Sequence, residues 1–329
     1  MRDDRIKRWL ILIFLLILFI VFFRLVSNSR WDGHSRLSLV LSVDNPDLSG
    51  LRSLVLFSIE PRTNRAVYLV VPGNTLLTVP FGYRDYLAAS VYKLGQLDKI
   101  RGGGQLLAKS IENTLGILIN GYLVSPNQSF PFVIDDEMNL KTLKSGKFSF
   151  YGLFWNFTSV IFSLNSLDTD FGLYDRIKLW WEVRKLRTDQ IDFYDLASLQ
   201  FMDEAVQADG SVIKKINTDL FDTKLGNIWE DSEIRRENVT LEIVNATEQE
   251  KVAGSFSDIL NHLGATVILT STDKTLQKEK CQIYLLNPLA GTSKVVKILQ
   301  KNYNCSILNK YFDSIQSDVR IVLGEDYLK

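Results

Sequence analysis

The sequence predicts a single-pass membrane protein whose larger part folds into two domains of mixed α and β structure. Three observations support this fold class. Residues 9–26 form one apolar run, the next part of the chain alternates between strand-like and helix-like stretches, and residues 238–329 show a regular order of strands and helices. The expected fold is therefore α/β and α+β, with an N-terminal transmembrane helix, a mixed sheet flanked by helices, and a small C-terminal domain.

The apolar run reads WLILIFLLILFIVFFRLV and contains Arg24 as its only charge. A helix that spans the hydrocarbon core needs about 20 apolar residues, whereas a buried helix of a soluble domain normally shows a polar face. No small-residue cleavage site follows the run, which favours an uncleaved anchor over a signal peptide. The tag 1–8 contains four basic residues, Arg2, Arg5, Lys7 and Arg8. The positive-inside rule keeps such residues in the cytoplasm, which places the bulk of the chain outside the cell membrane.

The composition excludes two classes of function. Lys and Arg total 38, as do Asp and Glu, so no excess of positive charge indicates a nucleic-acid partner. The two histidines, His34 and His262, form no cluster with cysteine, which argues against a zinc site. The two cysteines, Cys281 and Cys305, either pair in an oxidising compartment or remain two buried thiols.

The first domain is expected over residues 37–208, after a short polar tether at 27–36. Strands are predicted at 37–43, 54–59, 66–71 and 75–79, the second and third forming a hairpin. A helix is predicted over 105–115 and another over 176–193. Gly102-Gly103-Gly104 precedes the first helix, where it either cradles a phosphate or acts as a flexible hinge; the hinge is favoured because no Walker or dinucleotide motif accompanies it.

Two further segments stand out, one inside this domain and one between it and the next. Residues 148–164 are very apolar and aromatic, and form either a buried strand pair or a helix that lines a lipid-accepting cleft. Residues 209–237 are polar and rich in turn residues, as expected of a linker or an extended arm. From residue 238 to 329 the pattern β-α-β-β-α-β predicts a small sandwich with its helices on one face of the sheet.

Several motifs resemble the LytR-CpsA-Psr (LCP) family of bacterial envelope proteins. The strand LVLSVD ending at Asp44, the hairpin SLVLFSIEPRTNRAVYLVVP, the tyrosine-containing stretch 83–92 and the helix LLAKSIENTLGI carry the resemblance in the first domain. Asp170-Phe171-Gly172 followed by Arg176 is similar to the DFGRxxRQ-type motif of that family. Residues 238–327 are similar to the LytR C-terminal domain through LEIVNAT, VAG and the ending VRIVLGEDY.

The resemblance implies a function at the cell wall. Proteins of this family transfer a glycopolymer from a polyprenyl-pyrophosphate carrier to peptidoglycan; arginines hold the pyrophosphate, acidic residues hold Mg²⁺, and an apolar groove holds the lipid. The candidates in this sequence are Arg176, Arg52 and Arg84 for the phosphates, Asp44 and Asp170 for the metal, and Phe154, Trp155, Phe157 and Phe162 for the groove.

The departures from the family pattern fall on the residues that carry the chemistry. The IPRDT stretch reads Val71-Pro72-Gly73-Asn74-Thr75, without its arginine and aspartate, and the RSDT-type strand opening reads Leu51-Arg52-Ser53-Leu54, without an acid. In the DFGRxxRQ-type motif, Leu173 replaces the first arginine and Ile177 the glutamine. Glycine and leucine do not replace a guanidinium that forks onto two phosphate oxygens.

The sequence therefore favours a catalytically degenerate envelope protein, a pseudoenzyme. It would bind or scaffold a wall glycopolymer or its lipid-linked precursor, and the C-terminal domain would offer a surface for a protein partner. The alternative is an active phosphotransferase that uses Mg²⁺ and relocated basic residues such as Arg52, Arg84 and Arg176.

Overall fold

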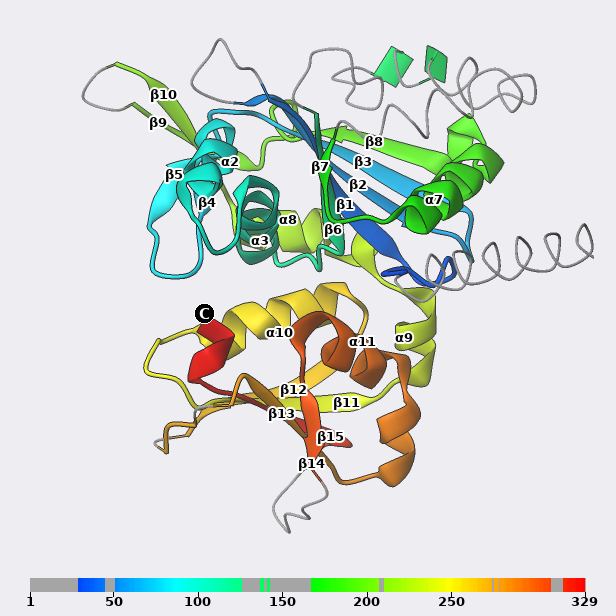
Figure 1. The fold of residues 1–329 in the computed structure, drawn as a ribbon, viewed down its shortest axis with the longest axis vertical. Helices are drawn as coiled ribbons and strands as arrows, with labels where there is room; N and C mark the ends of the chain where they lie inside the picture. The colour runs from blue at the N-terminus through cyan, green and yellow to red at the C-terminus, as the bar shows by residue number, and fades with distance from the viewer. Residues whose placement is uncertain are drawn as a thin grey trace, which may run out of the picture.

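The computed structural model describes residues 29–44, 51–125, 137–138, 141–142, 167–206, 210–273, 275–277, 279–308 and 316–328. Within these residues the chain forms two larger sheets, each with its own apolar core (Figure 1). The apolar run 9–26 and the aromatic segment 148–164 lie outside the described residues. None of the described helices is long and apolar enough to cross a membrane.

The first sheet has six strands in the order β7-β6-β1-β2-β3-β8. Strands β1, β2 and β3 are antiparallel neighbours, while β6 runs parallel to β1 and β8 runs parallel to β3. The carboxyl ends of β1, β3, β6 and β8 therefore meet at one edge, here called the carboxyl edge. The bounds are β1 Leu37–Asp44, β2 Leu51–Glu60, β3 Arg65–Val71, β6 Gly121–Ser125, β7 Asp168–Thr169 and β8 Ile191–Asp195.

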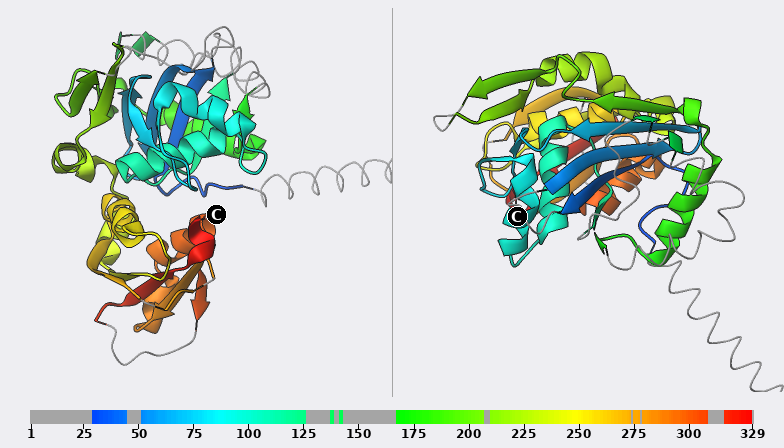
Figure 2. Two further views of the ribbon diagram at one scale, coloured as in Figure 1. Left: turned by 90° about the vertical axis from the view of Figure 1, so that its left-hand side faces the viewer. Right: turned by 90° about the horizontal axis from the view of Figure 1, so that it is seen from above.

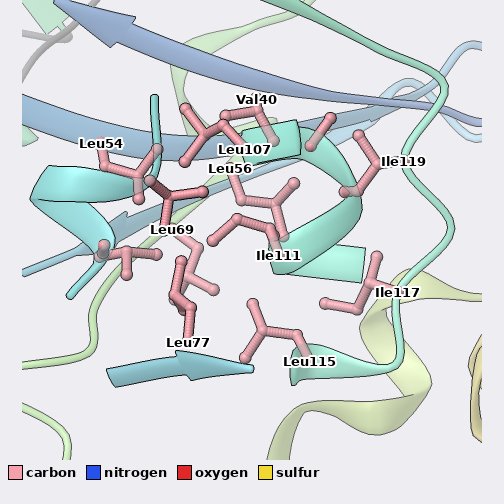
Figure 3. Packing of buried hydrophobic residues seen from close by; sticks show 14 of the residues in the cluster. Val40, Leu54, Leu56, Leu69, Leu77, Leu107, Ile111, Leu115, Ile117 and Ile119 are labelled. Carbon is pink, nitrogen blue, oxygen red and sulfur yellow. The ribbon is translucent and has the colours of Figure 1, made fainter. Parts of the chain in front are cut away.

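Helices cover both faces of this sheet. On one face, α2 (Ala88–Leu97) and α3 (Gly103–Leu115) pack on alternate residues of the strands, as Figure 3 shows for Leu107 and Ile111 against Val40. On the other face, α7 (Leu173–Lys185) belongs to a second cluster that contains Leu39 and Leu41. Because both faces are covered, every residue of β1 is buried, which explains its nearly continuous apolar sequence.

Helix α7 is shorter than the helix predicted over 176–193. It ends at Lys185 because Leu186 and Arg187 adopt extended backbone conformations. A short 3-10 turn, η2 (Thr188–Gln190), then leads into β8, whose alternating sequence IDFYD pairs with β3.

The three glycines at the start of α3 have two different roles. Gly102 adopts a φ of +80°, which favours glycine, whereas Gly103 and Gly104 are required by close packing. A Cβ on Gly103 would lie 2.7 Å from the ring of Tyr92, and a Cβ on Gly104 would lie 2.0 Å from the ring of Tyr122. The first turn of α3 therefore sits directly against two tyrosine rings. This packed arrangement is neither the hinge nor the phosphate loop that the sequence suggested.

The segment between the two larger sheets is folded against the first domain. It contains the hairpin β9 (Met202–Val206) and β10 (Val212–Ile216), then α8 (Thr218–Leu225), η3 (Gly226–Trp229) and α9 (Ser232–Glu237). Phe221, Leu225 and Trp229 are buried in the same core as α3. Residues 209–237 are therefore not an extended arm, although the domain boundaries themselves stay a prediction. A small sheet of β4 (Leu76–Thr78) and β5 (Asp85–Leu87) completes this part.

The second sheet has the order β12-β11-β15-β13-β14, and its elements follow the predicted order of strands and helices. Helices α10 (Val252–His262) and α11 (Lys294–Tyr303) lie between this sheet and the first domain (Figures 1 and 2). A disulfide joins Cys281 to Cys305, which decides between the two alternatives left by the sequence. The strands are β11 Thr240–Asn245, β12 Thr266–Thr272, β13 Cys281–Leu285, β14 Ser306–Leu308 and β15 Val319–Leu323, with 3-10 turns η4 Pro288–Thr292 and η5 Glu325–Leu328.

Side chains of α10 and α11 contact the first domain directly. The Nδ1 atom of His262 lies 2.8 Å from the carbonyl oxygen of Gly116, at the end of α3. The hydroxyl of Tyr303 donates to Glu112 over 3.4 Å. The two domains therefore meet along one side of α3.

Candidate functional site

Polar side chains gather at the carboxyl edge of the first sheet. Asp44 ends β1, and Asp168 begins β7; Ser42 of β1 and Asp168 both pair with Val124 of β6, so the two aspartates come from strands that flank β6. Helix α2 adds side chains above this edge, and β6 adds one more. We call this set the edge cluster: Asp44, Tyr92, Lys93, Tyr122 and Asp168.

One tyrosine bonds to the carboxylate of Asp168, and the charge of this carboxylate acts on a second. The hydroxyl of Tyr92 donates to Asp168 Oδ2 over 3.0 Å, and the charge of Asp168 acts on the phenol of Tyr122. Burial, followed by the charge of Asp168, raises the pKa of the Tyr92 phenol well above its ordinary value. Burial, with the charges of Asp168 and Asp170, raises the pKa of Tyr122 to about 12. Both phenols therefore stay neutral at physiological pH and act as hydrogen-bond donors.

Asp44 is the member of the cluster with an open acceptor. Its side chain is buried, and no hydrogen-bond donor among the described residues reaches its Oδ1 atom. The ammonium of Lys93 lies 3.7 Å from this oxygen, which is an ion-pair distance longer than a hydrogen bond. A buried carboxylate oxygen without a donor is an exception that needs an explanation, and a ligand hydroxyl would supply the missing donor.

Asp170 lies beside Tyr122 near the start of β6, away from the carboxyl edge, and its carboxylate is bonded to other groups. Its carboxylate accepts the backbone N–H of Tyr122 over 3.0 Å and pairs with the guanidinium of Arg30. Burial raises the pKa of this carboxyl group. The two metal candidates named from the sequence, Asp44 and Asp170, therefore sit at different levels of the sheet.

The structure does not bring Arg176 or Arg84 to the edge cluster, whereas Arg52 follows Leu51, which pairs with Asp44. Arg176 donates from Nε to the carbonyl of Phe171, whose ring packs against Gly121 at the start of β6. That level is four residues, or about 13 Å, from the carboxyl edge. Arg84 is exposed in the loop between β4 and β5. Arg52 lies near the start of β2.

The described residues do not fit the Mg²⁺ that the resemblance implies. Mg²⁺ requires near-octahedral oxygen ligands, usually including one or two carboxylates. Asp44 and Asp170 lie apart, and the carboxylate of Asp168 accepts the hydroxyl of Tyr92. In the part of the chain that the structure describes, no group of three His, Cys, Asp or Glu side chains is placed to hold a metal. The groove candidates Phe154, Trp155, Phe157 and Phe162 fall outside the described residues.

Positions 73 and 74, which lack the family's arginine and aspartate, have structural roles at the carboxyl edge. The carbonyl of Gly73 accepts the backbone N–H of Ala89 in the first turn of α2. The side-chain amide of Asn74 donates to the carbonyl of Val212 in β10 over 3.1 Å. A Cβ on Gly73 would lie 3.3 Å from the Cβ of Ala89, which is tighter than ordinary contact. The two residues thus join the strand end to α2 and to the β9–β10 hairpin.

A hollow of about 430 Å³ lies at the edge of the sheet opposite the carboxyl edge, where the two domains join. Arg36, on its wall, pairs with Glu60 over 3.1 Å, and both side chains are almost fully buried. Arg235 pairs with Glu230 on the same wall. These pairs neutralise much of the charge, so the hollow has the character of a structural junction.

Comparisons with known proteins give remote similarities. No family model matches the chain, and no curated protein matches it. Among solved structures, TagV from Bacillus subtilis gives a TM-score of 0.48 at 10% identity and covers 72% of this chain and all of that one. TagT from the same organism gives 0.40 at 16% identity, covering 59% of this chain and 89% of that one.

A third solved structure is described as the LytR-CPS2A-psr family protein YwtF (TagT) with bound octaprenyl pyrophosphate lipid. It gives a TM-score of 0.40 at 15% identity and covers 71% of this chain and 93% of that one. At these identities and TM-scores the similarity is a remote one of fold, and it assigns no activity or ligand to this chain.

Proposed function

We propose that this chain is a membrane-anchored envelope protein of LytR-CpsA-Psr type that binds a wall glycopolymer, or its polyprenyl-pyrophosphate-linked precursor, without transferring it. The observation that carries the proposal is which residues stand at positions 73 and 74 of the carboxyl edge. Where the sequence pattern of that family has an arginine and an aspartate, this chain has Gly73, which has no side chain, and Asn74, whose side-chain amide donates to Val212 of β10.

The chemistry of the edge cluster suits a polar, hydroxyl-rich ligand. It offers the two neutral phenols, the open acceptor of Asp44 and the single ammonium of Lys93. Sugar hydroxyls both donate and accept hydrogen bonds, and match such a mixed set. Phosphoryl transfer instead requires several cations that converge on the transferred group. Among the side chains that the structure describes in the edge cluster, Lys93 is the one cation, and it faces a carboxylate.

Two features support a location outside the cytoplasmic membrane. The apolar run 9–26, preceded by basic residues, has the composition of a single-pass anchor with a cytoplasmic N-terminus. The disulfide between Cys281 and Cys305 is of a kind that persists in oxidising compartments and is rare in the cytosol. The C-terminal domain would then lie in the cell wall, where a protein partner has access to it.

The test uses the full chain in lipid nanodiscs with a fluorescent polyprenyl-pyrophosphate sugar and Mg²⁺. We expect binding without transfer to peptidoglycan fragments. Asp44→Asn removes the open charged acceptor and should weaken binding about tenfold, because a hydrogen bond to a charged group contributes about 1.5–3 kcal/mol. Asp85→Asn, which changes an exposed aspartate on β5, is the matched control and should leave binding unchanged.

Two outcomes would contradict the proposal. Transfer that Arg176→Ala abolishes would show an active phosphotransferase and would favour the alternative function. Equal binding by wild type and Asp44→Asn would show that the ligand does not use the carboxyl edge.

A further inference from the structure

The chain that follows the apolar run is fastened to helix α7. Ser29 donates its hydroxyl to Asp175 over 2.6 Å, and the backbone N–H groups of Arg30 and Trp31 donate to the same carboxylate over 2.9 and 3.2 Å. Asp175 is fully buried, and Lys178, one turn further along α7, also bonds to Ser29. The stretch expected to be a loose tether is thus held by the first two turns of α7.

This attachment places α7 close to the predicted anchor. Ser29 is three residues after the last apolar residue, Val26. Even a fully extended chain spans at most about 3.6 Å per residue, so Ser29 lies within about 11 Å of the end of the run. This inference rests on the proposed membrane anchor: if residues 9–26 span the bilayer, the start of α7 lies at the membrane surface.

The outward face of α7 has the composition of an interfacial helix. Leu173, Ile177, Trp181 and Lys185 recur at every fourth position, which places them on one face; we call them the α7 stripe. Leu173 is 36% exposed and Trp181 is 45% exposed. The ammonium of Lys185 lies 5.8 Å from the centre of the Trp181 ring. Exposed tryptophan beside basic residues is typical of side chains at the headgroup level of a membrane.

The charge of this region favours an anionic surface. Residues 173–187 contain five cations and two carboxylates. Lys178 pairs with the buried Asp175, Lys185 pairs with Glu182, and Arg187 pairs with Asp189. With Asp189 included, residues 173–189 contain five cations and three carboxylates and keep a net charge of +2. Basic residues near a bilayer are attracted to anionic headgroups, and this attraction is screened by salt.

We propose that the α7 stripe docks on the anionic phospholipid surface that surrounds the anchor. The first domain would then be held down on the membrane at α7 instead of turning freely on a linker. The carboxyl edge would in turn keep a fixed orientation to the lipid surface from which a lipid-linked ligand arrives.

The test is fluorescence quenching by brominated lipid, with the full chain in nanodiscs. Because the two native cysteines are bonded to each other, Arg187→Cys supplies a single thiol for an environment-sensitive dye, two residues beyond α7 and with a side chain that is 76% exposed in the wild type. We expect strong quenching in discs that contain phosphatidylglycerol and less in discs of phosphatidylcholine alone or at high salt. Trp181→Ser in the same background should reduce the quenching severalfold.

A second probe site supplies the control. Leu289 is 78% exposed on η4 of the second domain, and a dye on Leu289→Cys should not be quenched. The anchor is tested separately, by washing vesicles that contain the chain with carbonate. If the chain stays in the vesicles, the docking of α7 alone would be refuted by the absence of quenching at position 187. The same quenching with Trp181→Ser would also refute it. A chain that carbonate extracts would instead refute the anchor, and with it both proposals.

Discussion

Replacing Asp222 by asparagine should remove a pH dependence that His262 gives to the contact between the two domains. His262 lies in the last turn of α10 and is buried. Its Nδ1 atom is 2.8 Å from the carbonyl oxygen of Gly116, and its Nε2 atom is 3.3 Å from Asp222 Oδ1. Both partners are acceptors, so the ring satisfies both only as an imidazolium, with a proton on each nitrogen.

The direction of the effect follows from the shift in the pKa of His262. Burial alone lowers this pKa, but the hydrogen bond to Asp222, the carbonyl of Gly116 and the charges of Asp222 and Asp258 outweigh it, and the pKa is raised. A raised folded-state pKa contributes stability that is fully present below the unfolded value of about 6.5 and is lost as the pH rises through the folded value. Burial also raises the pKa of Asp258, so the stability that this carboxyl group contributes is lost as the pH rises from about its ordinary value of 3.8.

The magnitude is limited by the exposure of Asp222. A hydrogen bond to a charged group contributes about 1.5–3 kcal/mol when it is buried. The side chain of Asp222 is 43% exposed, so solvent screening reduces its part to roughly 1 kcal/mol. A neutral His262 ring has one N–H group and keeps one of the two hydrogen bonds. Only one bond is therefore lost as the pH rises, and the bond to Gly116 does not add to the pH-dependent part of the unfolding free energy.

The assay is urea unfolding of the full chain in nanodiscs, measured at a series of pH values from about 6 to about 9, across the range in which a histidine titrates. The wild type should lose about 1 kcal/mol of unfolding free energy across this range, and Asp222→Asn should be flatter by that amount. Asp203→Asn, at an exposed position on β9, should keep the wild-type slope. A wild-type slope retained in Asp222→Asn, or lost equally in Asp203→Asn, would refute the reasoning.

Two further predictions concern stability. The disulfide closes a separation of 24 residues, so Cys281→Ser with Cys305→Ser should lower the unfolding free energy by about 3.5 kcal/mol on the chain-entropy estimate, measured as a lower urea midpoint without reductant. Gly104→Ala should destabilise the chain by about 1–3 kcal/mol, because its Cβ would overlap a tyrosine ring. Gly254→Ala in α10, where a Cβ meets nothing within 4 Å, should instead raise the thermal midpoint and stabilise by about 0.5–1 kcal/mol.

The second domain was predictable because its signals are local. Strand β11, helix α10 and strand β12 follow one another with clear changes of period, and Gly264 marks the end of the helix with a φ of +97°. Neighbouring elements of this domain need little information from distant parts of the chain. The expected order of strands and helices accordingly agrees with the structure.

The first sheet was predictable at β1 and at its hairpin. Strands β2 and β3 are joined by a four-residue turn, and their alternation and turn residues identify them. Strands β6 and β7 are short, and β6 pairs in parallel with β1, about eighty residues earlier. No local pattern encodes such a partner. Tyr122 and Asp168 were therefore missed as members of the edge cluster, whereas Asp44, at the end of a long apolar strand, was found.

The three glycines before α3 show why a motif requires its three-dimensional context. In the sequence they allowed two interpretations, both based on the backbone freedom of glycine. In the structure, Gly102 uses that freedom with a φ of +80°, whereas Gly103 and Gly104 are needed because they have no side chain, which lets α3 approach the rings of Tyr92 and Tyr122. The glycines thus help to shape the edge cluster indirectly, by setting the height of α3 above it.

The missing charges at the carboxyl edge are accommodated by the packing around them. If Gly73 were a simple exchange in an otherwise open phosphate site, space for a side chain would remain there. Instead, a Cβ at this position would approach the Cβ of Ala89 to 3.3 Å, while Ala89 itself bonds to the carbonyl of Gly73. An arginine at position 73 would therefore require the start of α2, the helix that carries Tyr92 and Lys93, to shift by a few tenths of an ångström. The residue at position 73 and two members of the edge cluster thus depend on the same placement of α2.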